Sequence, residues 1–309
     1  MSAMQDHPLI EFLSDGQRLH LRHGPIDLVI GAEGSEQEVM TAYRQAVSGF
    51  GSVLPELADE LELLRQPCTI SASPASGAIA RNMQRVTTPL ARKHFLTPMI
   101  AVAGAVADHM LGILTRGRVL RSAYVNNGGD IAVYLSSSAT FNIGICDDLG
   151  ARALGASVRI GSDDGISGIA TSGWKGRSFS LGIADAVTVL ARDAATADTA
   201  ATLIANHVDL PRSEKISRTA ARDISPDSDL GGRLVTTSVD ELSSEEVAEA
   251  LEAGRRIAVE MIQAETIVAA FMSLQGERIV CGELSASTSR LEGAMDPRGK
   301  PSSANSAGI

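Results

Sequence analysis

The middle of the chain constrains its fold most, because short apolar runs alternate there with turn-forming residues. Seven such runs lie between residues 121 and 190, separated by Gly, Asn, Asp and Ser. Short runs bounded by turn residues are typical of β-strands. We therefore predict strands over residues 121–126, 131–135, 140–146, 157–160, 168–172, 178–181 and 186–190.

Two alanine-rich stretches flank this region and are predicted to be helices. One begins at Thr97-Pro98 and runs to about Leu114, with proline in the first turn, where its missing N–H costs no hydrogen bond. The other spans residues 194–208, and because each stretch carries an Asp, the pair hints at an internal duplication. Further helices are predicted over residues 36–50, 54–64 and 243–272, a hairpin over 18–30, and strands over 235–239 and 277–281.

This mixture of hairpins, short strands and helices predicts an α+β fold with mixed or antiparallel sheets. The chain is 44% hydrophobic, which is enough for one large core, and residues 1–284 are predicted to form a single domain. From residue 285 onward Ser, Ala, Gly, Pro and Arg dominate without an apolar period. Residues 285–309 are therefore predicted to be a disordered tail.

The formal net charge of −10 disfavours nucleic-acid partners, because an acidic surface repels phosphate backbones. The N-terminus lacks a basic segment followed by an apolar stretch, so no secretory signal is predicted. The most apolar window, Met99 to Leu114, is interrupted by Asp108 and His109 and is predicted not to span a membrane. We expect a cytoplasmic protein that binds a small-molecule or nucleotide ligand, and homo-oligomerisation stays open.

The first of three candidate functional segments joins two predicted strands and contains Asn127, Gly128, Gly129 and Asp130. Paired glycines allow positive φ angles and let a ligand approach the backbone closely. The carboxylate of Asp130 adds a titratable group. An ordinary β-turn explains the same residues, because Asn-Gly is a standard hairpin signal.

The second candidate segment is the run Ala170, Thr171, Ser172 and Gly173. Hydroxyl side chains next to glycines expose O–H and N–H donors together, which suits phosphate or another anion. Lys175 and Arg177 follow closely and add positive charge. A Ser- and Gly-rich hairpin is the structural alternative.

The third candidate is the pair Asp198 and Thr202 in the second alanine-rich helix. The two residues are four apart, so their side chains lie on one face of the helix. A carboxylate and a hydroxyl placed in this way offer hard oxygen ligands to magnesium or calcium. Alternatively, the Asp interacts with the helix dipole and the Thr with its own backbone.

Taken in order, these segments resemble the ApbE-like superfamily. Its known members are flavin transferases that use FAD and magnesium to attach FMN to a Thr or Ser of a target protein. The residues that match are Asn127-Gly128-Gly129-Asp130, Ala170-Thr171-Ser172-Gly173, and Asp198 with Thr202. Residues 97–99, 124–132 and 176–185 are more narrowly similar to an uncharacterised bacterial and archaeal branch of this superfamily.

The resemblance implies an ApbE-like fold and a magnesium site made by Asp198, Thr202 and a backbone carbonyl near Val102. It also implies that FAD or FMN binds at the two glycine-containing segments, with the flavin pyrophosphate against Thr171-Ser172-Gly173. Magnesium would neutralise the charge of the pyrophosphate and of the leaving AMP.

Two departures from the superfamily pattern leave the reaction open: the His-x-x-Asp-Pro-x-x-Gly segment is absent, and Ala103 replaces a helix Lys. One hypothesis is a magnesium-dependent enzyme, a transferase or pyrophosphatase, acting on FAD or another nucleotide. A second is a hydrolase-like enzyme that holds a small organic anion with Arg177 and uses Asp130 or Asp185 as base. A third is a non-catalytic flavin binder.

Overall fold

The computed structural model describes residues 7–69, 73–150 and 153–282, and its largest element is a nine-stranded sheet. In their order across the sheet, the strands are β1 (Leu9–Phe12), β2 (Leu19–His23), β3 (Ile26–Gly34), β4 (Leu120–Asn127), β5 (Asp130–Leu135), β8 (Gly168–Ser172), β9 (Ala186–Ala191), β12 (Ala269–Leu274) and β13 (Glu277–Cys281). Every neighbouring pair is antiparallel. The predicted α+β class with antiparallel sheets is confirmed.

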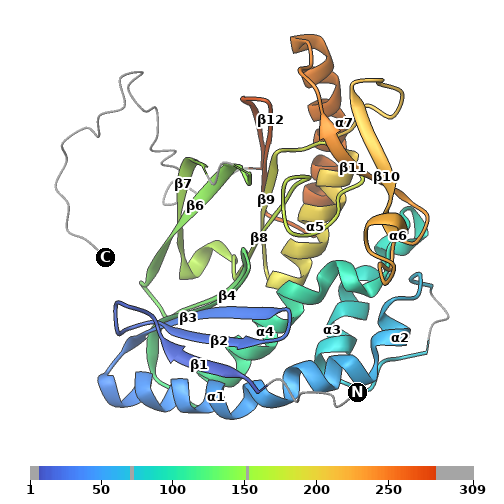
Figure 1. Ribbon diagram of the computed structural model, residues 1–309. Coiled ribbons are helices and arrows are strands. Elements are labelled where there is room, and N and C mark those ends of the chain that lie inside the picture. Colours follow the sequence, from blue (N-terminus) through green and yellow to red (C-terminus); the bar gives the residue numbers. More distant parts are fainter. Residues whose placement is uncertain (1–6, 70–72, 151–152, 283–309) are drawn as a thin grey trace.

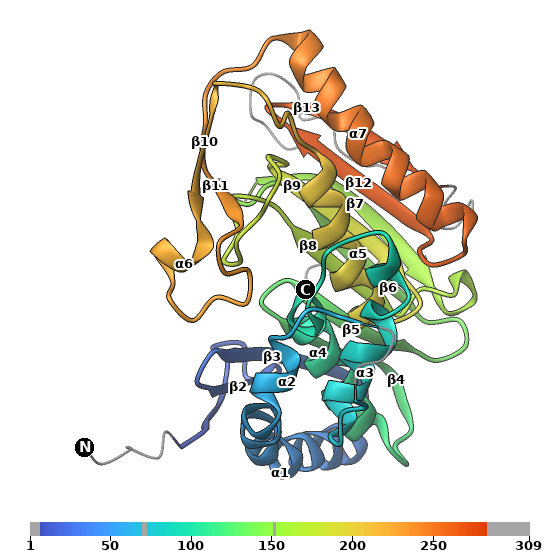
Figure 2. The ribbon, with the colours of Figure 1, turned by 90° about the vertical axis from the view of Figure 1, so that its right-hand side faces the viewer.

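Helices cover one face of this sheet, and a hairpin covers part of the other (Figure 1, Figure 2). The helices are α1 (Glu36–Asp59), α2 (Leu61–Leu64), α3 (Ala78–Thr87), α4 (Val102–Thr115), α5 (Ala194–His207), α6 (Ala221–Ile224) and α7 (Ser244–Gln263). The hairpin consists of β6 (Thr140–Asp148) and β7 (Ala153–Gly161). A further ribbon, β10 (Ile216–Ala220) and β11 (Leu234–Val239), has α6 in its connection.

The β6–β7 hairpin packs against the sheet through one apolar face. Ile143 and Ile145 of β6 and Val158 and Ile160 of β7 are buried in one cluster with Phe271 of β12. Their spacing of two residues is that of side chains on one face of a strand. The sheet is therefore sandwiched between this hairpin and the helices.

Each half of the large sheet repeats one topology, which is hairpin, helices, hairpin. In the first half β2–β3 leads through helices to β4–β5, and in the second β8–β9 leads through helices to β12–β13. This repeat agrees with the predicted internal duplication. The two alanine-rich helices do not occupy equivalent positions in it, because α4 is the last helix of its half and α5 is the first.

The two alanine-rich helices cap each other's N-termini. Asp198 of α5 accepts a hydrogen bond from the Gly104 N–H at 3.0 Å, and Asp108 of α4 accepts one each from the Ala194 and Ala195 N–H groups at 2.9 Å. Only glycine fits at position 104, because a Cβ atom there would lie 2.2 Å from the Ala194 carbonyl oxygen. This close crossing fixes Asp198 at the start of α4.

Among the described residues, one stretch is long and apolar enough to cross a membrane by length and composition, Pro98–Thr115. In the structure it forms a 3₁₀ turn, Pro98–Ala101, followed by α4. Helix α4 packs against α1, α3, α5 and the strands β4 and β5. The Asp108 that interrupts its apolar sequence accepts hydrogen bonds from the Ala194 and Ala195 N–H groups at the start of α5, whose N-cap residue is Asp193.

Three sequence predictions of secondary structure are wrong. The helix predicted over residues 243–272 ends at Gln263, and every residue of the following strand β12 is buried. A strand buried on both faces has no apolar alternation, so its sequence resembles the end of a helix. The break predicted at Gly51-Ser52 is absent, since α1 continues through Pro55, and residues 178–181 form no strand.

The predicted hairpin over residues 18–30 and the helix start at Ser243, with its capping box to Glu246, are confirmed. The elements β1, α3, β10 and α6 were not predicted. The predicted tail, residues 285–309, lies outside the described residues, as does the end of the predicted domain.

Candidate functional site

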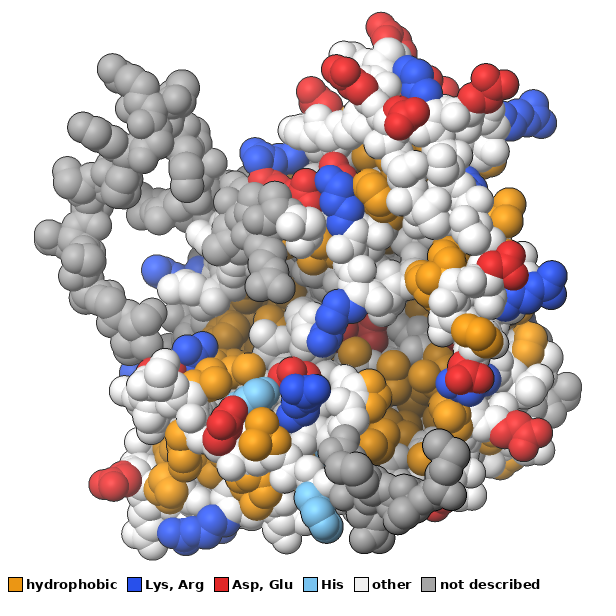
Figure 3. Space-filling model, in the orientation of Figure 1, with side chains coloured by type: hydrophobic (Ala, Val, Ile, Leu, Met, Phe, Trp, Pro, Cys, Tyr) orange, Lys and Arg blue, Asp and Glu red, His pale blue; other side chains and the backbone are white. Residues whose placement is uncertain are grey.

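The three candidate segments lie around one cleft of about 690 Å³, which we call the polar compartment. It is bounded by the β4–β5 turn, the end of β8 with the loop that follows, and α5. Its wall includes Gly128, Gly129, Asp130, Thr171, Ser172, Gly173, Lys175, Arg177, Asp198 and Thr202. Figure 3 shows a hollowed face of the molecule on which acidic, basic and apolar side chains meet.

A second hollow of about 320 Å³ adjoins the first, and we call it the apolar compartment. The wall residues common to both are Ala103, Asp130, Arg177, Ser178, Asp198 and Thr202. The side chains that give the second compartment its apolar character are Phe95, Leu96, Met99, Ile100, Val102, Phe179, Leu181 and Leu230. Thr97, Asn206, Ser228 and Asp229 add polar groups to the same wall, and the charged groups of the site stand where the two compartments meet.

Two carboxylates meet at this junction, Asp130 at the start of β5 and Asp198 in the second turn of α5. Burial raises the pKa of Asp130 to about 7, against the opposing effects of the Thr171 N–H and the Arg177 charge. Burial also raises the pKa of Asp198 well above its usual range, and the Asp130 charge raises it further. Such a pair is stabilised when it shares a proton or binds a cation.

The backbone angles of the Gly128-Gly129 turn favour glycine at both positions, and a neighbouring side chain favours it further at Gly128. The two φ angles are 69° and 119°, which L-residues rarely adopt. A Cβ atom on Gly128 would lie 1.6 Å from Nη2 of Arg177, so the guanidinium rests directly on the turn. The segment is thus both the β-turn that Asn-Gly predicts and a place of close approach to a charged group.

The loop after β8 supplies the positive charge of the polar compartment. Lys175 forms ion pairs with Asp148 at 2.9 Å and with Asp185 at 3.0 Å. Within the described part of the chain, Arg177 has no carboxylate at ion-pair distance. Its guanidinium is therefore the group best placed to receive an anion.

Four predicted site residues lie outside the wall of the polar compartment, namely Asn127, Ala170, Asp185 and Val102. Asn127 is buried behind the turn, where its Nδ2 donates to the Ala103 carbonyl oxygen at 3.1 Å. Asp185 is only 5% exposed and accepts from the Gln275 N–H at 2.6 Å in addition to its pair with Lys175. Of the two candidate bases, Asp130 faces the cleft and Asp185 positions Lys175.

Two aspartates near the Asp130–Asp198 pair were not among the predicted site residues. Asp27 of β3 lines the polar compartment, and its Oδ1 lies 2.9 Å from Nε2 of His20. Asp108 lies behind Asp198, and burial raises its pKa to about 6, against the opposing Ala195 and Ala194 N–H groups. Asp27 and His20 belong to neighbouring strands of one hairpin, whereas the partners of Asp108 in α5 are more than 80 residues away in the chain.

Comparison with known proteins identifies the family. The family described as "AbpE bacteria" matches residues 10–280. This chain belongs to that family. The predicted membership of an uncharacterised branch of ApbE-like proteins is confirmed.

Two archaeal relatives, both named UPF0280 protein, are similar to part of this AbpE-family chain. The protein from Methanothermobacter thermautotrophicus is 34% identical over 157 residues, covering 51% of this chain and 56% of the relative. The protein from Methanopyrus kandleri is 39% identical over 130 residues, covering 41% and 48%. The chain thus spans about half the length of the curated relatives it matches.

A solved structure is also similar to this AbpE-family chain. The crystal structure of the ApbE protein from Thermotoga maritima covers 91% of this chain and 97% of its own, at 12% identity and a TM-score of 0.44.

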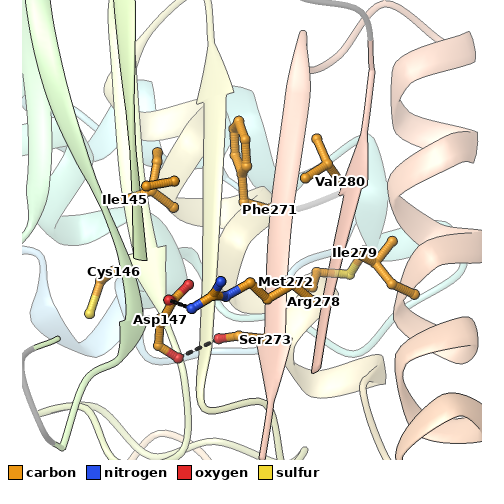
Figure 4. A pocket seen from close by; sticks show the side chains of 10 residues that line it. Ile145, Cys146, Asp147, Phe271, Met272, Ser273, Arg278, Ile279 and Val280 are labelled. Atoms are coloured by element: carbon orange, nitrogen blue, oxygen red, sulfur yellow. Dashed lines mark hydrogen bonds and ion pairs between the residues drawn. The ribbon is translucent and has the colours of Figure 1, made fainter. Parts of the chain in front are cut away.

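Outside the cleft, this AbpE-family chain has a hollow of about 270 Å³ between β6 and the strands β12 and β13 (Figure 4). Its lining is mainly apolar, with Ile145, Phe271 and Val280 around it. The charged groups at its rim, Arg278 and Asp147, are paired with each other. This hollow therefore offers no unpaired charge to a ligand, in contrast to the polar compartment.

Proposed function

We propose that this protein binds magnesium together with an anionic nucleotide, either a flavin nucleotide or another pyrophosphate-bearing one, in the polar compartment. The observation that carries the proposal is the Asp130–Asp198 pair, which lies in one cleft wall with Thr171, Ser172, Gly173 and Arg177, and whose Asp130 carboxylate accepts a hydrogen bond from the Thr171 N–H. Carboxylates that repel each other favour a cation, and a cation together with an arginine favours a phosphate-bearing ligand.

The donor atoms fit a hard cation. Within the described residues, no group of three or more His, Cys, Asp or Glu side chains could hold a metal. Asp198 and Thr202 instead offer carboxylate and hydroxyl oxygens one helical turn apart, and the superfamily resemblance adds a backbone carbonyl near Val102. Magnesium takes such ligands together with substrate phosphates and water. When bound, it would supply charge neutralisation for a pyrophosphate and its leaving group.

The chain's own residues would bind and orient the anion. Arg177 can form paired hydrogen bonds to phosphate oxygens, and Ser172 lines the same wall. The Thr171 hydroxyl lies 2.9 Å from that of Thr188, and the Thr171 N–H donates to Asp130, so this residue supports the wall. Lys175 adds charge but is held by Asp148 and Asp185. The volume of about 690 Å³ favours a nucleotide over the small organic anion of the hydrolase hypothesis.

A proton acceptor stands beside this anion site. Burial raises the pKa of Asp130 to about 7 in the metal-free protein, and a bound magnesium ion would lower it, so that Asp130 could act as a general base toward an attacking hydroxyl or water. Cleavage of FAD between its phosphates, with transfer of FMN to a protein hydroxyl or to water, is the reaction this arrangement would support.

Thermal denaturation with FAD or ADP, each with and without magnesium, tests the binding proposal. Ligand with magnesium should raise the melting temperature, because a ligand that binds only the native state stabilises it. The Asp198→Ala variant should lose the magnesium-dependent part of the shift. No shift with any flavin or adenine nucleotide in the wild-type protein would contradict the proposal.

Product analysis tests the reaction. Release of AMP and FMN from FAD in the presence of magnesium would show turnover. The Asp130→Asn variant should lose this release. Tight flavin binding without any release would instead identify a non-catalytic flavin binder.

A further inference from the structure

The strand β1 forms one edge of the nine-stranded sheet and carries apolar side chains on its surface (Figure 1). All four of its residues are exposed, and Leu9, Ile10 and Phe12 are each between 45% and 48% exposed. Edge strands of natural proteins instead tend to carry charges, which discourage pairing with another chain. The opposite edge, β13, follows this rule more closely, since it begins with the exposed Glu277 and Arg278.

Two of the exposed side chains of β1 continue an apolar layer of the fold. Ile10 and Phe12 lie opposite Leu21 and Leu19 of β2, which are both buried in one core with residues of α1. The Phe12 ring also contacts the ring of Tyr43 in α1, with the two ring centres 5.9 Å apart. The apolar layer between the sheet and its helices is therefore open to solvent at β1.

The pairing of β1 with β2 shows which backbone groups of β1 face outward. The Leu13 N–H donates to the Arg18 carbonyl oxygen, so the backbone of Leu13 faces β2. Because backbone groups alternate in direction along an antiparallel strand, those of Glu11 also face β2, whereas those of Ile10 and Phe12 face outward. Among the residues that the structure describes, no strand pairs with this outer side of β1.

We propose that β1 pairs with β1 of a second copy of this chain, in an antiparallel arrangement about a two-fold axis. A two-fold axis perpendicular to the sheet makes such a pair antiparallel, like every other pair in this sheet, and keeps the helices of both copies on one face. One register satisfies both outward-facing residues, because it places Ile10 of each copy opposite Phe12 of the other. Each of these pairs exchanges both N–H···O hydrogen bonds, and the two apolar layers become continuous.

The charges on the other face of β1 are compatible with this register. It brings the two Glu11 side chains together at the two-fold axis, where uncompensated carboxylates would repel each other. Nδ1 of His20 lies 3.0 Å from Glu11, and its Nε2 lies 2.9 Å from Asp27. A histidine with a carboxylate at each nitrogen donates to both only as the imidazolium, and the bond to Glu11 raises the pKa of His20 accordingly. Each Glu11 therefore has a positive charge beside it.

This interface is independent of the proposed function, but it adjoins the candidate site. Asp27, the second partner of His20, lines the polar compartment. The row Glu11–His20–Asp27 therefore runs from the two-fold axis to the wall of the cleft.

Sedimentation of the full chain tests whether β1 forms the interface. The wild-type protein should dimerise at concentrations up to roughly 100 μM. Ile10→Lys should weaken dimerisation about tenfold or more, because it places a charge in the shared apolar layer. Leu234→Lys is the matched control, since Leu234 is also exposed but lies on β11, and it should dimerise like the wild type. A monomeric wild-type protein, or equal effects of the two lysines, overturns the proposal.

Disulfide trapping tests the register. In the proposed pair, the two Glu11 Cα atoms lie about 4.5 Å apart, which is within the range of a disulfide bond. Glu11→Cys should therefore give a covalent dimer on a non-reducing gel after oxidation. Gln17→Cys, an exposed position in the turn after β1, and the wild-type protein with its three cysteines should not. A sedimenting dimer that Glu11→Cys does not trap overturns the β1 pairing, as does equal trapping by Gln17→Cys. Glu11 and Ile10 are both exposed, so neither substitution disturbs the core.

Discussion

The two ends of the α4–α5 contact are built alike and differ in what surrounds them. At one end Asp108 receives two N–H groups of α5 and contacts Asn82, while at the other end Asp198 receives the Gly104 N–H of α4. Asp198 also faces Asp130 and the open cleft. The same helix-capping geometry therefore serves stability at one end and leaves a carboxylate available to a ligand at the other.

The largest difference between the two carboxylates should be in magnesium binding. Asp198→Ala should remove the stabilisation by magnesium, which is roughly 2.7 kcal/mol at a concentration one hundred times the Kd. Asp108→Asn should retain it, because Asp108 does not line either compartment. Chemical denaturation with and without magnesium measures both. An equal loss in the two variants would show that the site is not confined to the Asp198 end.

In the absence of magnesium, replacing Asp108 should lower the free energy of unfolding more than replacing Asp198. Asp108→Ala leaves the buried Ala194 and Ala195 N–H groups without acceptors and should cost roughly 3 kcal/mol. Asp198→Ala loses a cap as well, but it also removes repulsion with Asp130, so the net cost should be about 1 kcal/mol. Urea denaturation at pH 7.5 measures the difference. A larger loss in Asp198→Ala would contradict the assignment of the structural role to Asp108.

The stability of the metal-free protein should depend on pH through these carboxylates. A folded-state pKa of about 6 for Asp108 and about 7 for Asp130 exceeds the unfolded value of 3.8, so the folded state holds the proton more tightly. This stabilisation is complete below pH 3.8 and is lost as pH rises through 6 and 7. Asp130→Asn should reduce the loss of stability near pH 7. Saturating magnesium should do the same, because a nearby cation lowers the pKa of a carboxyl group. Melting temperatures between pH 5 and 8 measure the slope, and a slope that magnesium leaves unchanged would place the cation elsewhere.

The smallest expected effect is a difference in pyrophosphate affinity between variants of the two glycines beside the cleft. Gly128→Ala should strain the turn and displace Arg177, which lowers pyrophosphate affinity about tenfold through a lost charge-assisted hydrogen bond. Gly129→Ala should strain the turn more, because its φ of 119° lies outside the left-handed region, but it should leave Arg177 in place, because nothing lies within 4 Å of its added Cβ. Titration with pyrophosphate and magnesium compares the two variants. Equal affinities would mean that Arg177 does not bind the anion.

The local motifs of the candidate site were predictable because each depends on nearby residues. The Asn-Gly turn, the hydroxyl-rich end of β8 and the start of α5 all lie where the sequence predicted them. Their common order also pointed to the correct family. The secondary structure was less predictable where burial removes the pattern, as in β12, whose first residues were predicted to be the end of a helix.

Local chemistry thus determined the turn, the loop and the helix that carry Asp130, Thr171 and Asp198. Only the tertiary structure decided that Asp130 and Asp198 face each other, that Asp185 belongs to Lys175, and that an apolar compartment adjoins the charged one. The physical reason is that turns and caps depend on neighbours a few residues away. A pKa, an ion pair and a compartment depend on which distant segments the fold brings together.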